Sequence, residues 1–249
     1  AKGSNAQLYY QIAYDECKSI MTEGQHGLNA NFEAVFRALH DNTEDGAHEV
    51  IFAVGAFGGN AATDSKIGYY NGMRHGDDSN WKSSGGINAI ATYFYEFGKY
   101  DIRRDVTVAS MQINNTNQAI LATGAVCTDG KFRKSWTNVT GTAQNLAIDW
   151  PLLRYSDILL MFAEADNEIN GSPSSEAVNA VKQVRNRAYV GNLGQAGTIP
   201  TDKTGFFNYI VHERLLEFGG EGLRKYDLIR WNLLAAKIAE TRQKLQDFL

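Results

Sequence analysis

The 249-residue sequence has few prolines and cysteines, and it lacks long hydrophobic segments and a strong net charge. Three prolines against 24 glycines are compatible with helices joined by glycine-rich loops. Cys17 and Cys127 lie far apart and form no CxxC motif, so they indicate neither a metal site nor a redox compartment. Apolar runs such as Ile51 to Phe57 fall far short of the roughly 20 residues that cross a bilayer. The sequence therefore predicts no transmembrane helix.

The charge balance and the hydrophobic content exclude two further classes of protein. The formal net charge is -4, and 43% of the residues are hydrophobic, with 11% aromatic. Non-specific nucleic-acid binding needs a basic surface that displaces counterions, which this balance does not provide. Intrinsic disorder requires low hydrophobicity and high net charge. We therefore expect a folded protein that does not bind nucleic acid.

Hydrophobic spacing predicts helices near the N-terminal end and a strand near residue 50. Apolar residues recur every three or four positions over 4–22, and Gly24 suits the C-terminal end of that helix. A short second helix is expected over 32–39, and residues 50–54 are strand-like. Further along, a helix is expected over 87–97 and strands over 103–113 and 131–139.

The last hundred residues predict four amphipathic helices. Pro151 fits the first turn of the first helix, which Asn170-Gly171 would end. Ser172-Pro173 suits the start of the second helix, so that the two form a helical hairpin. Thr204 can cap a third helix, and a fourth is expected to begin near Gly222. Paired helices of this length resemble tetratricopeptide units.

Catalytic and metal-binding motifs have little support in the sequence. Glu164 and Glu168 are one turn apart on a helix, whereas the paired carboxylates of a glycosidase face each other across a cleft. His212-Glu213 lacks the second histidine of a helical zinc motif. Arginines interleave with these acids, which favours structural ion pairs between packed helices. We predict no catalytic residue, no metal and no cofactor.

The glycine-rich segment between residues 55 and 86 is the candidate binding region. Sugar rings pack on aromatic side chains, and their hydroxyls bond to carboxylate, amide and guanidinium groups. Such groups gather at Tyr69, Tyr70, Asn71, Arg74, Asp77, Asp78, Asn80 and Trp81. Trp136 is a second candidate platform. The alternative, which stays open for Trp81 and Trp136, is that these aromatic rings only pack the loop onto the rest of the protein.

Several segments resemble those of a known family. The string WPLLRYSDILLMFAEA, at 150–165, resembles the helix signature of the SusD/RagB family, the surface glycan-binding lipoproteins of Bacteroidetes. VKQVRNRA, at 181–188, resembles the next helix of that family, and HERLLEFGGEGLRKYDLIRW, at 212–231, resembles its closing pattern. Residues 49–54 and 100–105 are two weaker landmarks. Together these segments extend over nearly the whole chain.

The resemblance implies a mainly α fold, in which tetratricopeptide-like helical hairpins carry a large loop-rich insert and a few short strands. Residues 1–249 would form one domain fragment, with the helical scaffold at 1–50 and 150–249 and the loop-rich ligand face at 51–149. Family members also have an N-terminal half, so this chain would be the C-terminal half. The charged residues that match family positions are expected to be structural: Glu164, Arg185, Glu213, Arg214, Glu217, Glu221, Arg224, Asp227 and Arg230.

The resemblance also implies a function. The protein would capture an oligo- or polysaccharide at the outer-membrane cell surface, without catalysis, and deliver it to a SusC-like TonB-dependent transporter. Its membrane attachment would come only from a lipid anchor that this chain does not contain. Three alternatives remain open: a helical glycoside hydrolase, a module that only docks onto the transporter, and uptake of peptides.

Overall fold

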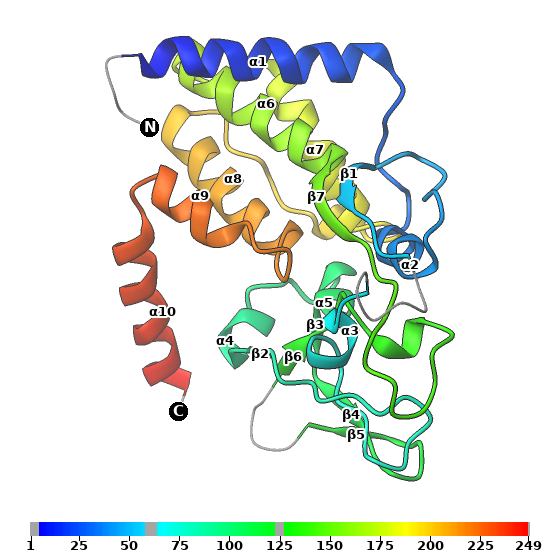
Figure 1. The fold of residues 1–249 in the computed structure, drawn as a ribbon. Helices are drawn as coiled ribbons and strands as arrows, with labels where there is room; N and C mark the ends of the chain where they lie inside the picture. The colour runs from blue at the N-terminus through cyan, green and yellow to red at the C-terminus, as the bar shows by residue number, and fades with distance from the viewer. Residues whose placement is uncertain (1–4, 58–63, 123–126, 249) are drawn as a thin grey trace. The chain divides into compact units, whose positions relative to one another are not determined.

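The computed structural model describes residues 5–57, 64–122 and 127–248 (Figure 1). Helices dominate and the strands are short, so the predicted mainly α fold class is confirmed. The helices are α1 (Ala6–Glu23), α2 (Phe32–Asp41), α3 (Ile67–Tyr70), α4 (Ala91–Phe94), α5 (Arg103–Thr107), α6 (Tyr155–Asn170), α7 (Ser175–Ala188), α8 (Lys203–Glu217), α9 (Arg224–Arg230) and α10 (Leu234–Phe248). The strands are β1 (Val50–Val54), β2 (Asn88–Ala89), β3 (Val108–Ala109), β4 (Met111–Ile113), β5 (Ala119–Leu121), β6 (Cys127–Asp129) and β7 (Trp150–Arg154). Two 3-10 helices are η1 (Lys134–Trp136) and η2 (Leu193–Gln195).

The chain divides into two compact units. Unit 1 consists of Ala1–Asn31, Asp45–Phe52 and Leu152–Lys237, and unit 2 consists of Phe32–Glu44, Ala53–Pro151 and Ile238–Leu249. The strands form small sheets in the orders β1-β7, β2-β6-β3 and β4-β5. The expected single domain with a ligand face over 51–149 stays a prediction. No helix of the described residues is both long enough and apolar enough to cross a bilayer.

Helix α6 lies at the centre of unit 1. It contacts α1, α7 and α8, and Figure 1 shows α1, α6 and α7 running alongside one another. Because neighbouring helices cover it on several sides, most of its residues are buried, polar ones included. Phe162 is fully buried, and its ring centroid lies 4.9 Å from that of Tyr14 on α1. Helices α6 and α7 form the predicted hairpin, and Gly171 ends α6 with a left-handed φ of 74°.

Two helices begin at caps other than the predicted ones. Ser174, rather than Ser172, caps α7, because its hydroxyl accepts a hydrogen bond from the backbone N–H of Ala177 at 3.1 Å. Asp202, rather than Thr204, caps α8 by accepting a backbone N–H three residues along at 2.8 Å. In both cases the sequence holds two suitable cap residues within two positions, so composition alone does not choose between them.

Two further boundaries also differ from the prediction. Pro151 lies in β7, which pairs with β1, and helix α6 begins only at Tyr155. The expected fourth helix is two helices, α9 and α10. Asn232 separates them with a left-handed φ of 56°, a conformation that asparagine tolerates better than most residues. The apolar spacing continues across Asn232, which is why periodicity does not detect the break.

The segment 87–139 of unit 2 departs most from the prediction. The expected helix over 87–97 is reduced to α4, because residues 88 and 89 pair as β2 with β6. The expected strand over 103–113 begins instead as α5, where the Asp101 carboxylate accepts the backbone N–H of Arg103 at 3.0 Å. Strands β3 and β4 then follow. The expected strand over 131–139 is wrong, since its regular part is η1.

Lys134 of η1 makes buried contacts with three loop positions. Its side chain is buried, and Nζ donates hydrogen bonds to the carbonyl oxygens of Lys82, Gly141 and Ala143 at 3.0, 2.7 and 2.5 Å. One ammonium group therefore ties three loop positions of unit 2 together. Burial lowers the pKa of Lys134.

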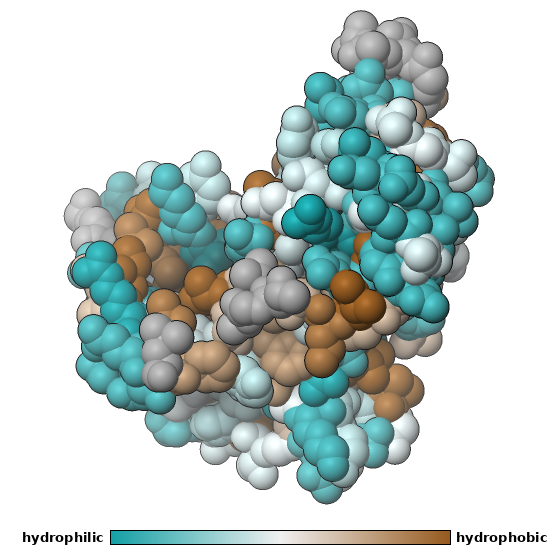
Figure 2. Space-filling view, turned by 90° about the horizontal axis from the view of Figure 1, so that it is seen from below, coloured by the Kyte–Doolittle hydropathy of each residue, from teal (hydrophilic) through white to brown (hydrophobic). Residues whose placement is uncertain are grey.

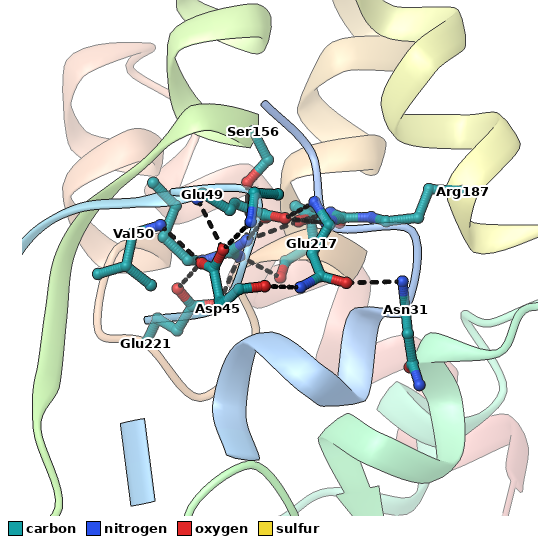
Figure 3. A network of polar contacts seen from close by, with 11 residues as sticks. Asn31, Asp45, Glu49, Val50, Ser156, Arg187, Glu217 and Glu221 are labelled. Atoms are coloured by element: carbon teal, nitrogen blue, oxygen red, sulfur yellow. Dashed lines mark hydrogen bonds and ion pairs between the residues drawn. The ribbon is translucent and has the colours of Figure 1, made fainter. Parts of the chain in front are cut away.

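A buried ionic network connects segments of unit 1 (Figure 3). Arg154 of β7 donates to the carboxylates of Glu49, Glu217 and Glu221 at 2.7, 3.0 and 2.8 Å. Arg187 of α7 also pairs with Glu49 and Glu217. All five side chains are buried. Burial alone lowers the pKa of Arg154, but the surrounding carboxylates, Glu221 and Glu217 foremost, raise it well above its ordinary value.

A second cluster of ion pairs lies among α6, α8 and α9. Arg214 donates to Asp157 at 2.5 Å and to Asp227 at 2.7 Å. Arg230 holds the Glu164 carboxylate through two bonds, at 2.5 and 2.8 Å. Most of the charged side chains that the sequence assigns to the scaffold thus pair with opposite charges, and Arg224 donates instead to the Val211 carbonyl at 2.8 Å. These contacts agree with the expected structural role.

Candidate functional site

Residues 74–76 form the centre of the candidate site in unit 2. His75 makes an antiparallel bridge with Ser83 and a parallel bridge with Ile113 of β4. The Ile113 N–H donates to the Arg74 carbonyl at 2.9 Å, and the Gly76 N–H donates to the Ile113 carbonyl at 2.8 Å. Strand β4 in turn pairs with β5. The backbone of this segment is therefore held on both sides, like the middle strand of a small sheet.

Two glycines permit this close packing. A Cβ atom at Gly76 would lie 2.8 Å from the backbone nitrogen of Asn115, and one at Gly85 would lie 2.7 Å from the backbone nitrogen of Arg74. Both distances are far below the roughly 3.5 Å of optimal heavy-atom contact. Gly85 also has a left-handed φ of 55°. A side chain at either position would push the central segment away from its neighbours.

A turn rich in amides joins β4 to β5. The side-chain oxygen of Asn114 accepts the backbone N–H groups of Thr116 and Gln118 at 3.0 and 2.9 Å. Asn117 takes a left-handed φ of 61°, and its side-chain oxygen accepts the backbone N–H of Asn80 at 2.8 Å. The turn is thus ordered by its own side chains and is attached to the loop that the sequence singles out.

Two open hollows adjoin Arg74. The first has a volume of about 470 Å³ and the second about 270 Å³. Arg74 and Gln112 border both hollows. No aspartate or glutamate is among the described residues that line them. The other polar lining residues are Asn114, Asn115 and Thr116 in the first hollow and Ser84, Asn88 and Thr128 in the second.

The lining of the first hollow also includes an apolar side chain. Ile120 of β5, which is 39% exposed, forms part of its lining. In the space-filling view from below (Figure 2), hydrophilic residues cover much of the visible surface, and hydrophobic residues form separate patches. A ligand with both hydroxyl groups and C–H faces would match such a mixed lining.

Of the two adjacent tyrosines predicted to bind, only Tyr70 is exposed. Its side chain is 45% exposed, whereas Tyr69 is 9% exposed and packs edge-on against it with ring centroids 5.1 Å apart. Tyr69 therefore has little free ring surface to offer a sugar. Asn71 is half-buried and donates to the buried carboxylate of Asp129 at 3.1 Å. Burial raises the pKa of Asp129.

The remaining polar residues of the predicted cluster are exposed. Arg74, Asp77, Asp78 and Asn80 all have solvent-accessible side chains. Asp77 pairs with Lys82 at 3.2 Å. The loop thus brings exposed carboxylate, amide and guanidinium groups close together in sequence, beside the amide-rich turn that holds its backbone. Their contact with a ligand stays a prediction.

Trp81 is half-buried rather than fully exposed. Its ring packs edge-on against His75, with centroids 6.2 Å apart. The indole Nε1 and both ring nitrogens of His75 are buried and have no hydrogen-bond partner within the described residues. Packing of Trp81 against His75 is therefore the role that the contacts support, and sugar stacking by Trp81 remains untested.

His75 is expected to make stability depend on pH. Burial, with smaller contributions from Lys134 and Arg133, lowers the pKa of the imidazole to about 4. The unfolded chain takes up this proton below about 6.5, so the free energy of unfolding should fall as the pH drops from about 6.5 toward 4. Urea unfolding across this range should show a smaller loss for His75→Leu than for the wild type, with the exposed His212→Leu as the matched control. Equal losses in wild type and His75→Leu would contradict the prediction.

Trp136 is covered by two guanidinium groups. The Cζ atoms of Arg37 and Arg133 lie 4.4 and 4.8 Å from its ring centroid, and the ring of His40 lies 5.3 Å away. Trp136 is itself half-buried. These contacts favour the packing alternative that the sequence leaves open, since the cations occupy ring surface that a sugar would need.

The sequence analysis missed Gln112, Asn115 and Thr116. They belong to a strand and turn whose partners lie elsewhere in the chain, so no local pattern brings them to Arg74. One signal is present: the run from Asn114 to Gln118 contains four amide side chains in five residues. Amides at this density favour turns and offer donors and acceptors to a polar ligand.

Comparison with known sequences identifies relatives over most of the chain. The sequence model of the SusD family matches residues 48–248. SusD-like protein P25 of Formosa agariphila is 27% identical over 264 aligned positions, which cover 90% of this chain and 47% of that protein. SusD-like protein P38 of the same organism is 42% identical over 86 positions, which cover 32% of this chain and 16% of that protein. The chain thus spans about half the length of P25.

Solved structures share the fold. A SusD homolog from Bacteroides thetaiotaomicron is similar with a TM-score of 0.86 and 24% identity, covering 98% of this chain and 52% of that chain. Surface glycan-binding protein A from the same organism, solved in complex with laminarihexaose, has a TM-score of 0.71 and 19% identity, covering 93% of this chain and 52% of that chain. At these identities the likeness shows a common fold. Because the family match extends over most of the residues, the chain belongs to the SusD family.

Proposed function

We propose that the protein binds an oligo- or polysaccharide at the cell surface without cleaving it and delivers it to a SusC-like TonB-dependent transporter of the outer membrane. The observation that carries the proposal is the pair of hollows that Arg74 and Gln112 both border. Their polar lining consists of amides, hydroxyls and one guanidinium, which are the groups that bond to sugar hydroxyls. Membership of the SusD family and the laminarihexaose complex of a fold neighbour support a carbohydrate as ligand.

The site would bind by hydrogen bonds together with limited apolar contact. Gln112 and the amide-rich turn supply donors and acceptors, and Ile120 supplies apolar surface in the first hollow. The turn is ordered by its own hydrogen bonds, so little conformational entropy would be lost on binding. The hollows are open and water competes for the same groups. We therefore expect dissociation constants of about micromolar to millimolar, or roughly 4 to 8 kcal/mol.

Binding without cleavage is proposed because of the chemistry of the lining. Glycoside hydrolysis generally uses two carboxyl groups that face each other across the scissile bond. The described lining of the two hollows includes no aspartate or glutamate. New reducing ends after incubation with a bound glycan would favour the hydrolase alternative. Capture of a transporter without any affinity for sugars would favour the docking alternative.

Gln112→Ala is expected to weaken glycan binding by about 2- to 10-fold, because it removes an amide that borders both hollows. One hydrogen bond of this kind contributes about 0.5 to 1.5 kcal/mol to the binding free energy. Titration calorimetry with a panel of neutral and acidic hexasaccharides measures the change. Gln195→Ala, at an exposed position of unit 1, is the matched control and should leave affinity unaltered. Equal affinities for wild type and Gln112→Ala would place the ligand elsewhere.

A further inference from the structure

Arg74 differs from most arginines of the chain in the partners of its guanidinium group. Arg103, Arg154 and Arg214 are buried and held by carboxylates. Arg133 donates to the carbonyl oxygens of Gly130 and Asp105. The Arg74 side chain, in contrast, is exposed and has no hydrogen-bond or ion-pair partner among the residues that the structure describes. Its five donors are therefore available to a ligand.

The backbone of Arg74 is fixed although its side chain is unpaired. Its carbonyl accepts the N–H of Ile113, and Gly85 packs so closely that an added Cβ would lie 2.7 Å from its nitrogen. The neighbouring His75 is buried, which directs alternate side chains of this extended segment to the opposite face. Arg74 thus combines a fixed backbone with an exposed side chain, and it borders both hollows.

The surroundings of Arg74 favour an anion. Amide and hydroxyl groups make up the rest of the polar lining, and they can donate to a negatively charged oxygen without repelling it. No described carboxylate lines either hollow. The acid next along the loop, Asp77, pairs with Lys82 at 3.2 Å, which balances part of its charge. An anionic group seated at Arg74 would therefore meet one unpaired cation and neutral donors.

We propose that the ligand is an acidic glycan whose anionic substituent, a carboxylate or a sulfate, is bound by Arg74 while the hydroxyls of the same sugar and its neighbours bond to Gln112 and the amides of the Asn114–Gln118 turn. The planar guanidinium fork fits two oxygens of either anion. This inference rests on the proposed glycan-binding function and specifies the class of glycan.

The test compares three hexasaccharide probes: a galacturonate oligomer, a sulfated carrageenan oligomer and neutral laminarihexaose. Titration calorimetry of each probe is carried out with the wild type, Arg74→Gln, Arg74→Lys and the matched control Arg242→Gln, which changes another exposed arginine. We expect at least one anionic probe to bind more tightly than laminarihexaose and to lose about 10- to 100-fold in affinity in Arg74→Gln. Arg74→Lys should restore part of the loss, and Arg242→Gln should lose nothing.

Salt gives a second readout, because added sodium chloride should weaken binding of the anionic probe in the wild type and much less in Arg74→Gln. Preference for the galacturonate or for the sulfated oligomer identifies which anion the site takes. Tighter binding of laminarihexaose, unaffected by Arg74→Gln, would overturn the acidic-glycan inference and leave glycan binding standing. Failure of the wild type to bind any of the three probes would count against the proposed function itself, and the inference would fall with it.

Discussion

Arg154→Ala is expected to lower the free energy of unfolding by about 3 to 5 kcal/mol. The substitution removes the cation that Glu49, Glu217 and Glu221 share, and each of these carboxylates is at most 4% exposed. Water does not replace the lost bonds at such depth, so the negative charges remain poorly compensated. Urea unfolding followed by circular dichroism measures the change.

The control for this prediction is an exposed arginine that takes no part in the buried ionic network. Arg242 lies on the exposed surface of α10, and Arg242→Ala should alter the free energy of unfolding by no more than about 0.5 kcal/mol. If the two alanine variants unfolded at the same urea concentration, the ionic network would contribute nothing specific to stability, contrary to our interpretation of it.

Phe162→Ala should destabilise the protein by a similar amount, about 3 to 5 kcal/mol. Phe162 is fully buried in α6, and it packs against Tyr14 of α1. Removing its ring leaves a cavity in a helix that neighbours cover on several sides, so the surroundings have little freedom to collapse into it. Thermal and urea unfolding of the variant test the estimate.

Phe57→Ala is the matched control, because Phe57 is 87% exposed and buries little surface that the substitution could remove. Its expected change is within about 0.5 kcal/mol. A loss of less than about 1 kcal/mol for Phe162→Ala would show that α6 is not the packed centre of unit 1.

The helices of unit 1 were predictable because their signals are local. Apolar residues recur with the helical period through α6 and α7, and Gly171 supplies the left-handed end that α6 requires. Two of the errors concern caps, where Ser174 competes with Ser172 and Asp202 with Thr204. Such choices depend on which side chain reaches a backbone N–H, and sequence spacing does not encode that.

The strands of unit 2 were predicted only in part, because the expected strand over 103–113 contains β3 and β4, whereas β2, β5 and β6 were missed. The sheet of β2, β6 and β3 joins segments that are far apart in the sequence. Asn88 pairs with Thr128, and His75 bridges to both Ser83 and Ile113. Segments of two or three residues carry no periodicity of their own, so tertiary pairing decides their conformation. The same reason explains why Gln112 escaped notice as a neighbour of Arg74.

Sequence composition indicated the chemistry of the candidate site better than its geometry. The segment from Tyr69 to Trp81 does contain exposed polar groups, and Arg74 does border both hollows. Exposure, however, differs sharply between adjacent residues, 9% for Tyr69 and 45% for Tyr70. The Tyr69 ring lies 5.9 Å from the ammonium of Lys134, which is held by the carbonyl oxygens of positions 82, 141 and 143, and local sequence does not encode these contacts.

The most direct test of the account is a nuclear magnetic resonance titration that follows side-chain amide signals while a galacturonate or carrageenan hexasaccharide is added. Saturable shifts of the NH₂ groups of Gln112, Asn114 and Asn115, without release of reducing ends, are the predicted result. Saturable shifts confined to other parts of the protein, with these three amides unmoved, would contradict a glycan site at Arg74.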